Sequence, residues 1–417
     1  MTHHDETFAR IPTHLALDPR DGDGKPVEEV RLLVRGQGTV GLALARIATF
    51  TVAIGALDDS AAPAFRWSVT QTGATLSERA GGEWKEVAVA LTPAAALDPE
   101  PNCVYWFSFD AHNRTLGYGK GEMRLATRLA SHEYPRPAKA TDPDPYAWFG
   151  QATSVHVEPG LERPTDVWRD PVTVEPALRV LPVDAISMKQ MAQGTHTVAA
   201  NLTTACQQLY SNVAGAQFLL DTPDFPQFGE AIEESIASKD GWCRTTLDHK
   251  ADEFGPHDPD KTYLRITMGV NQGESPGIPF VVEIWPPGHY SPIHNHGGAD
   301  AVIRVLRGRI HVSLFAMLSM KHQDAFGDAH FDEGEVTWIS PRLNQNHQLK
   351  NDGDITCVTI QCYQYAESDL THYPYFDYIG EAEIGHFDPN SDMDFLKFKA
   401  KMKEEWEKAH PTGSPGA

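Results

Sequence analysis

The sequence predicts a mainly β protein with two β-rich regions, and three observations support this. Short apolar runs separated by turn residues occupy residues 28–130, and strand-like runs return between residues 262 and 365. Prolines are concentrated between these regions, where they disfavour helix interiors and central strands. The chain of 417 residues has the length of about two to three domains, at roughly 100–200 residues each. We therefore expect two folded domains joined by a connector.

The first β-rich region predicts a β-sandwich domain over residues 28–130. Several of its apolar runs alternate with polar residues, which is typical of half-buried strands, and glycines between the runs supply turns. Predicted strands cover residues 30–34, 50–54, 65–69, 87–91 and 104–109. About 100 residues of strands at this spacing favour two packed antiparallel sheets.

Residues 131–184 predict an extended, proline-rich connector. This stretch holds nine of the chain's 30 prolines, and prolines at this density cannot lie inside helices or central strands. Its aromatic residues, Trp148 and Phe149 among them, indicate that the connector lies on a domain surface. The second domain is then expected over residues 185–400.

The second domain is expected to combine helices with strands. Asp184 is a candidate N-cap for the first helix, and Gly241 is a candidate C-terminal stop for the third. Apolar residues at positions 225, 228, 232 and 236 place one apolar face on that third helix. Helices are expected over residues 186–191, 202–210, 225–236 and 392–410.

Charge and composition exclude several classes of partner. The formal net charge is −22, from 35 basic and 57 acidic residues, and a chain this acidic repels phosphate backbones and anionic lipid. No apolar run approaches the ~20 residues of a membrane span, and the first residues lack the pattern of a secretory signal. The five cysteines form no CxxC pair. We therefore expect a cytoplasmic protein that binds neither nucleic acid nor membrane, with its oligomeric state left open.

Three histidines carry the clearest chemical signal. His294 and His296 are two residues apart, and residues i and i+2 of a strand point to the same face. His347 follows His296 by 51 residues, which is enough chain for a few intervening strands. Three neutral imidazoles that converge on one point suit a divalent first-row metal ion. The pattern therefore predicts a metal site formed by these three residues.

The surrounding residues extend this pattern. Gly288 lies six residues before His294, Gly308 lies twelve residues after His296, and Asn351 follows His347 closely. This two-part arrangement resembles the cupin family over about residues 260–365. The resemblance implies a jelly-roll-like β-barrel with flanking helices.

One position departs from the usual cupin pattern. Cupins commonly place a glutamate ligand a few residues after the HxH pair, and in this chain that slot falls on Ala301. Asp300 is one residue off, and a one-residue shift on a strand turns a side chain to the other face. We therefore expect three histidine ligands without a carboxylate. Such a site is compatible with Fe(II) whose substrate supplies an anion.

Within the cupins, the region is similar to the cysteine dioxygenase family of thiol dioxygenases, which hold one iron on three histidines. The family's Tyr-x-Arg pattern matches Tyr263 and Arg265, and its last strand matches Tyr363, with Gln361 at the place of a histidine. The resemblance implies that Tyr263 and Arg265 bind the substrate, with Arg265 on its carboxylate. It also implies that Tyr363 and Gln361 act near the reacting oxygen. The implied reaction converts a small thiol carboxylate, such as cysteine or a mercapto acid, to its sulfinic acid with O₂ and Fe(II).

Two further interpretations remain open from the sequence. The second domain could be a cupin that uses Mn, Ni or Fe on a non-thiol substrate, or the metal could only stabilise a binding module. Animal thiol dioxygenases join a cysteine at the Ala301 slot to the tyrosine, so we expect that cross-link to be absent. We interpret His311, His322, His330 and His372 as surface or loop residues.

Overall fold

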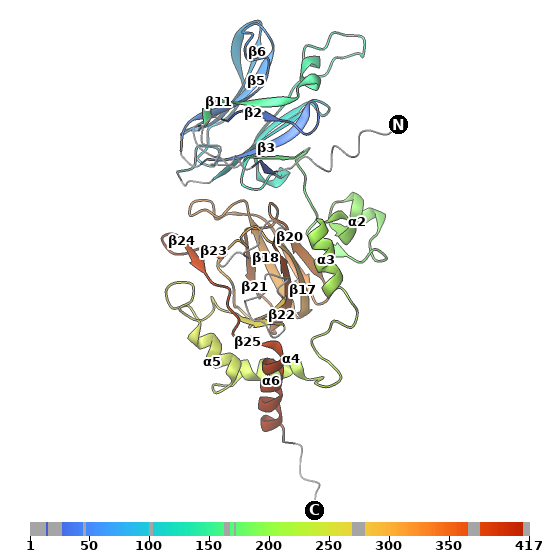
Figure 1. The fold of residues 1–417 in the computed structure, drawn as a ribbon, viewed down its shortest axis with the longest axis vertical. Helices are drawn as coiled ribbons and strands as arrows, with labels where there is room; N and C mark the ends of the chain where they lie inside the picture. Colours follow the sequence, from blue (N-terminus) through green and yellow to red (C-terminus); the bar gives the residue numbers. More distant parts are fainter. Residues whose placement is uncertain are drawn as a thin grey trace, which may run out of the picture. The chain divides into compact units, whose positions relative to one another are not determined.

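The structure of the protein is a computed structural model that describes residues 14–15, 27–44, 47–99, 103–161, 167–170, 172–268, 280–365 and 376–411 (Figure 1). The chain divides into two compact units, Met1–Glu175 and Pro176–Ala417. Each unit has its own sheets and core, and each is described by itself below. Among the described residues, no helix is long and apolar enough to cross a membrane.

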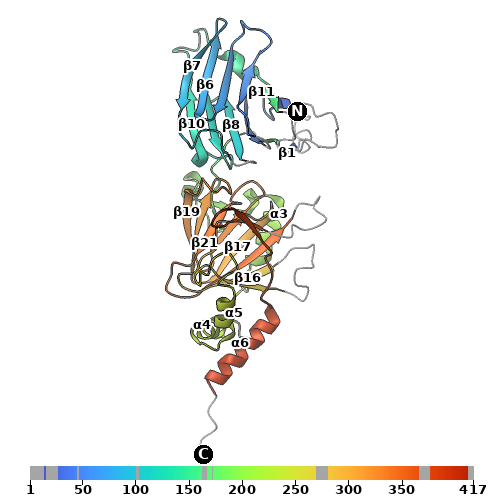
Figure 2. The same ribbon diagram turned by 90° about the vertical axis from the view of Figure 1, so that its left-hand side faces the viewer.

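The first unit is a β-sandwich of two six-stranded antiparallel sheets. One sheet has the order β1-β12-β3-β8-β9-β10, and the other has the order β2-β11-β4-β5-β6-β7. Figure 2 shows β6 and β7 of one sheet with β8 and β10 of the other. The strands are β1 (His14–Leu15), β2 (Val27–Arg31), β3 (Gln37–Ala43), β4 (Phe50–Gly55), β5 (Ala64–Thr70), β6 (Gly73–Ala80), β7 (Glu83–Ala90), β8 (Val104–Asp110), β9 (Thr115–Lys120), β10 (Arg128–Glu133), β11 (Ser154–Leu161) and β12 (Val167–Asp170).

Aromatic side chains from both sheets form the core of this sandwich. The ring of Phe50 on β4 meets Tyr105 on β8 edge-on, with centroids 5.4 Å apart. Trp67 on β5 lies 5.7 Å from Tyr118 on β9. All four side chains are buried, and rings in such contacts supply much of the burial energy of a core. The predicted β-sandwich is therefore confirmed.

The structure differs from the predicted connector over residues 131–184. Strand β11 pairs with both β2 and β4, so it is an interior strand of its sheet, and β12 pairs with β1 and β3. The division between the two units falls after Glu175. Pro159 lies in the register shift of β11 between His156 and Leu161, where the ladder to β2 is interrupted. A proline can occupy such an irregularity, so proline density alone overestimated the extent of irregular chain.

The described part of the second unit contains three sheets: two that face each other and resemble a jelly roll, and a two-stranded sheet of β23 and β24. The larger sheet has the order β14-β13-β20-β17-β22-β16-β15-β25, and a three-stranded sheet has the order β19-β18-β21. Across the described residues these ladders stay separate and do not close into a continuous barrel. The strands are β13 (Arg179–Leu181), β14 (His196–Val198), β15 (Leu264–Thr267), β16 (Phe280–Trp285), β17 (Asp300–Arg307), β18 (Arg309–Phe315), β19 (Ala325–Asp332), β20 (Val336–Ile339), β21 (His347–Lys350), β22 (Cys357–Gln364), β23 (Phe376–Ile379), β24 (Ile384–Phe387) and β25 (Met393–Asp394).

The larger sheet separates two apolar cores. Ile360 and Cys362 of β22 belong to the core that includes the helices, whereas Cys357 and Tyr363 belong to the core between the two sheets. This alternation follows from the two-residue period of a strand. Thr359 and Gln361 are four and two residues from Tyr363, so their side chains point to the same face of the sheet as Tyr363. Polar residues of β22 therefore face the space between the two sheets. The mainly β fold with a jelly-roll-like second domain and flanking helices is confirmed.

Helices cover the outer face of the larger sheet, with α4, α5 and α6 gathered at one end of the unit in Figure 1. Ser187, and not Asp184, caps the first helix with its side chain. Gly241 is not the stop of α4; it is the N-cap of an additional helix, α5. A Cβ at Gly241 would lie 2.0 Å from the carbonyl oxygen of Ser235, so close packing explains this glycine. The helices are α2 (Met188–Ala192), α3 (Thr204–Val213), α4 (Phe228–Ala237), α5 (Trp242–His249) and α6 (Phe395–Ala409).

Candidate metal centre

The three predicted ligands meet between the two sheets of the second unit. His294 and His296 lie between β16 and β17, and His347 begins β21. The backbones of His294 and His347 exchange two hydrogen bonds of 3.0 Å, N to O in each direction. One ring nitrogen from each of the three residues lies within 4.8 Å of the others. The sequence prediction that these histidines come together therefore agrees with the structure, while their role as ligands stays a prediction.

The HxH segment is less regular than predicted. His294 forms isolated bridges to His347 and Tyr378 and is not part of a continuous strand. Gly297 and Gly298 follow with φ angles of 60° and 77°, a backbone conformation that glycine adopts readily. The bridge to His347 fixes the first imidazole, and the glycine turn then leads the chain into β17.

Hydrogen bonds orient the three imidazoles. Nδ1 of His294 lies 3.0 Å from the carbonyl oxygen of Pro292, and Nδ1 of His296 lies 3.4 Å from that of Gln345. The ring of His347 donates a hydrogen bond to the backbone carbonyl of Asn344. Because a carbonyl only accepts, each contacting nitrogen must carry the proton, which leaves the other nitrogen with its lone pair. Among the described residues, the Nε2 atom of His347 is buried without a hydrogen-bond partner. These residues therefore fit a metal ion, which would take the three free lone pairs.

Burial keeps the three imidazoles neutral. Desolvation lowers the pKa of His294 to about 4, and it lowers the pKa values of His296 and His347 well below the ordinary value. The neighbouring histidines lower the pKa of His296 further. Only the neutral form of histidine binds a metal ion. The cluster is therefore ready to bind metal at neutral pH without losing protons.

The histidine group contains no carboxylate among the residues that the structure describes. Ala301, at the usual glutamate slot, lies directly opposite Tyr363 on β22. Asp300 turns away and accepts a 2.7 Å hydrogen bond from Thr203, which caps α3. This is the outcome that the one-residue shift predicts. The candidate ligand set is therefore three neutral imidazoles.

A network of four buried polar side chains lies beside the three histidines. The guanidinium of Arg265 on β15 donates from Nη1 to Oε1 of Glu283 on β16, over 2.6 Å. The side-chain amide of Gln361 donates to the other oxygen of Glu283, and the hydroxyl of Tyr363 donates to the carbonyl of Gln361. The ring of Tyr363 then stacks on His296, with centroids 5.7 Å apart. The network therefore links Arg265 to a candidate metal ligand through three side chains.

The Arg265–Glu283 contact is an ion pair. Burial lowers the pKa of Arg265, but Glu283 offsets this, so its pKa lies above its ordinary value. Burial raises the pKa of Glu283, and Arg265 opposes that rise. A guanidinium keeps its proton in proteins, and a 2.6 Å contact together with a second donor on the carboxylate favours the ionised form. We therefore describe the pair as charged at neutral pH.

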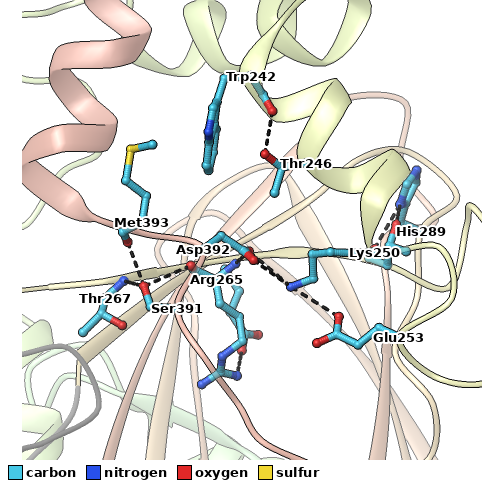
Figure 3. Close-up of polar contacts among 12 residues, drawn as sticks. Trp242, Thr246, Lys250, Glu253, Arg265, Thr267, His289, Ser391, Asp392 and Met393 are labelled. Atoms are coloured by element: carbon cyan, nitrogen blue, oxygen red, sulfur yellow. Dashed lines mark hydrogen bonds and ion pairs between the residues drawn. The ribbon is translucent and has the colours of Figure 1, made fainter.

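The surrounding chain fixes Arg265 and Tyr263 in place. The backbone nitrogen of Arg265 donates to Asp392 over 2.7 Å, and Lys250 holds the same carboxylate at 3.2 Å. In Figure 3 the side chain of Arg265 extends away from Asp392 and Lys250. Tyr263 is buried in a stack on Trp285, with centroids 4.1 Å apart. Tyr263 and Arg265, the predicted substrate-binding residues, therefore both lie on the inner face of the larger sheet, and these contacts hold them in place.

Glu283 is the site residue that the sequence analysis missed. It follows Phe280-Val281-Val282 and precedes Ile284-Trp285, so it is the single charge of an otherwise apolar strand. Its exposed fraction is 2%. A buried carboxylate must be paired, so the single charge in this apolar strand was the signal for a buried partner. Its place opposite Arg265 follows from the register between β15 and β16.

A second group with metal-binding side chains lies on the outer face of the smaller sheet. His311 and His330 are paired across β18 and β19, and their rings stack with centroids 4.4 Å apart. His330 contacts Asp352 at 2.7 Å, and His311 lies 3.4 Å from Asp328. Both histidines are half-buried and Asp352 is exposed, and within the described part of the chain Nε2 of His311 is buried without a hydrogen-bond partner. The group lies at the edge of the protein surface, and each histidine contacts a carboxylate. His372 lies outside the residues that the structure describes.

Comparison with known proteins gives a limited likeness. No family model matches the chain. Similar solved structures include a cupin_2 domain of an XRE-family transcriptional regulator from Enterobacter cloacae, with 11% identity over 25% of this chain and 98% of that chain, and a TM-score of 0.21. An oxalate oxidase in complex with the substrate analogue glycolate has 16% identity over 29% of this chain and 57% of that chain, with a TM-score of 0.23. A cupin-superfamily sugar phosphate isomerase from Silicibacter pomeroyi has 13% identity over 27% of this chain and 68% of that chain, with a TM-score of 0.19. Two of the three are cupins by description, and at these scores the likeness carries no argument about activity.

Proposed function

We propose that the second unit is an Fe(II)-dependent dioxygenase that converts a small thiol to its sulfinic acid. The observation that carries this proposal is the convergence of three buried, neutral imidazoles without a carboxylate among the described residues. Such a site leaves the metal's charge uncompensated, so it favours a substrate that supplies an anion, as a thiolate does. The resemblance of Tyr263, Arg265 and Tyr363 to the thiol dioxygenase pattern supports the same class.

Iron would be held by His294, His296 and His347, and it would supply redox chemistry and favour the thiolate form of the substrate. The protein's own groups would orient and enclose the reactants. The ring of Tyr363 stacks on His296, and its hydroxyl donates a hydrogen bond to Gln361. These two contacts would fix the orientation of Tyr363 beside the metal site. Burial raises the pKa of Tyr363 well above its ordinary value, so its hydroxyl would remain a hydrogen-bond donor throughout.

The proposed reaction balances without another reductant. One thiol and one O₂ give one sulfinic acid, with both oxygen atoms on sulfur. The partners are therefore a small-molecule thiol and O₂. The five cysteines are free and buried, which fits a compartment that keeps thiols reduced, and we propose the cytoplasm as the location.

Metal reconstitution with oxygen-uptake measurements would test this proposal. The metal-free protein is loaded anaerobically with Fe(II), Mn(II) or Ni(II), and O₂ consumption is recorded with and without a panel of small thiols. We expect thiol-dependent uptake with Fe(II) alone, one O₂ per thiol, and a product that carries both atoms of labelled O₂. His296→Ala should abolish uptake, and His311→Ala should retain it as the matched control. Uptake without thiol, equal activity with Mn(II) or Ni(II), or disulfide as the main product would contradict the proposal.

A further inference from the structure

Arg265 already has a carboxylate partner inside the protein. Arg265 and Glu283 are directly opposite each other on β15 and β16, and both side chains are buried. Nη1 of Arg265 lies 2.6 Å from Oε1 of Glu283. The second oxygen of Glu283 accepts from Gln361. The guanidinium of Arg265, which was expected to bind a substrate carboxylate, is therefore already paired with the carboxylate of Glu283.

We infer that Glu283 determines substrate class, and that the site selects small thiols whose remaining groups are uncharged, such as mercaptoalcohols. This inference rests on the proposed thiol dioxygenase function and changes the expectation that Arg265 clamps a substrate carboxylate. A carboxylate thiol would bring a second anion to a guanidinium whose charge Glu283 already balances. In a buried site, two carboxylates near one guanidinium repel each other, and one of them must be protonated or displaced. A thiol whose remaining groups are uncharged meets no such cost.

Glu283 also acts as a positioning residue for the reacting centre. Its carboxylate orients the amide of Gln361, and Gln361 in turn accepts from the hydroxyl of Tyr363. The ring of Tyr363 lies on His296. Losing the carboxylate should therefore change selectivity through Arg265 and, separately, loosen the orientation of Tyr363.

Unpaired polar atoms show where the network can still accept a ligand. Within the described part of the chain, Nε of Arg265 and Oγ1 of Thr359 are buried without hydrogen-bond partners. Thr359 lies opposite Glu283 on β22. Buried polar atoms of this kind are normally satisfied. A neutral donor or acceptor on the substrate, or a water beside it, can satisfy them without adding charge.

The first part of the test is a substrate comparison with the iron-loaded wild type. 2-Mercaptoethanol and 3-mercaptopropionate are compared by oxygen uptake, and their anaerobic binding is measured by calorimetry. We expect 2-mercaptoethanol, which adds no further charge, to be favoured in kcat/KM by about a hundredfold or more, since an uncompensated buried charge costs that much in binding. A preference for 3-mercaptopropionate in both measurements would overturn the inference. This part requires no substitution, so it holds even if a variant fails to fold.

The second part uses metal-free protein, so its result does not depend on the proposed activity. Glu283→Gln keeps the shape of the side chain but leaves Arg265 without a counter-charge. We expect 3-mercaptopropionate and propionate to raise the melting temperature of Glu283→Gln, because a carboxylate can now pair with Arg265. Wild type, the double variant Arg265→Met/Glu283→Gln and the control Glu335→Gln should show no such rise. Glu335 is a suitable control because it is ion-paired with Arg179 outside this network.

The two parts separate two kinds of failure. If no thiol is oxidised but carboxylates stabilise only Glu283→Gln, the proposed function fails while the assignment of Glu283 stands. If carboxylates stabilise wild type and Glu283→Gln equally, Glu283 does not block Arg265 and the inference is wrong. In the active enzyme, Glu283→Gln should also raise kcat/KM for 3-mercaptopropionate by about tenfold or more over wild type, as the charge of Arg265 becomes available.

Discussion

Ala301 and Tyr363 lie directly opposite each other on β17 and β22, and both belong to the core between the two sheets, where Tyr363 stacks on His296. Side chains at opposite positions of an antiparallel pair have Cβ atoms about 4.5–5.5 Å apart. A cysteine at position 301 would therefore lie beside the ring of Tyr363. This geometry makes the expected absence of a cysteine–tyrosine bond testable in both directions.

We predict that Ala301→Cys will form a thioether with Tyr363 when iron, O₂ and a thiol substrate are present. The bond replaces one S–H and one ring C–H, with O₂ as oxidant, so the chain loses two hydrogen atoms. Mass spectrometry of the intact chain and of its peptides measures this loss. Val302→Cys, whose side chain belongs to the helix-side core, is the matched control and should not cross-link. A cross-link in wild type, or none in Ala301→Cys under turnover, would contradict the proposed arrangement.

The buried ion pair predicts a specific pattern of stability. Arg265→Met leaves the carboxyl group of Glu283 buried without its partner, and we expect a loss of about 3–5 kcal/mol in the free energy of unfolding. Arg265→Met/Glu283→Leu removes both groups and should recover about half of that loss. The remainder should be about 1–3 kcal/mol, because the amide of Gln361 loses its acceptor. Urea unfolding of wild type and the variants measures this, and a double variant less stable than Arg265→Met would contradict the pairing.

The histidine cluster predicts how the stability of the metal-free protein depends on pH. The folded-state pKa of His294 is lowered to about 4, and those of His296 and His347 are also lowered. As pH falls below the unfolded value of about 6.5, the unfolded chain takes up protons that the folded chain does not, so stability falls. The full contribution is present above about pH 6.5 and is lost on the way to about pH 4.

Denaturant unfolding of the metal-free protein between pH 7 and pH 4 measures this loss. The difference between wild type and His294→Gln isolates one histidine from the carboxylates that titrate in the same range. We expect the slope of stability against pH to be shallower in His294→Gln by up to about 1.4 kcal/mol per pH unit. Identical slopes would mean that His294 is not held neutral by burial.

The sequence predicted the site better than it predicted the boundaries around it. The spacing of His294, His296 and His347 predicted a cluster, and the structure brings the three rings together, although His294 pairs through isolated bridges and not within a continuous strand. The role of residues 154–161 as an interior strand depends on pairing with β2 and β4, which are distant in sequence. Gly241 was misread because its packing against Ser235 is a tertiary contact that no helix-end pattern contains.

Glu283 illustrates the same limit within the site. The resemblance implied that Arg265 holds a substrate carboxylate, whereas the structure places Glu283 against its guanidinium. The assignment of that partner requires the register between β15 and β16, and the occupancy of the second carboxylate oxygen requires β22 as well. Residue type and spacing therefore predicted the grouping of the three histidines, whereas the partner of Arg265 depends on pairings among three strands.

The most direct test of the central claim is the iron content of the protein after anaerobic loading with Fe(II) and removal of free metal. The account predicts one iron per chain in wild type and in His330→Ala, which alters the histidine group on the smaller sheet. It predicts almost none in His294→Ala, His296→Ala or His347→Ala, each of which should keep the wild-type circular dichroism spectrum. Full iron in any of these three variants, or a loss of iron in His330→Ala alone, would contradict the assignment of the metal centre.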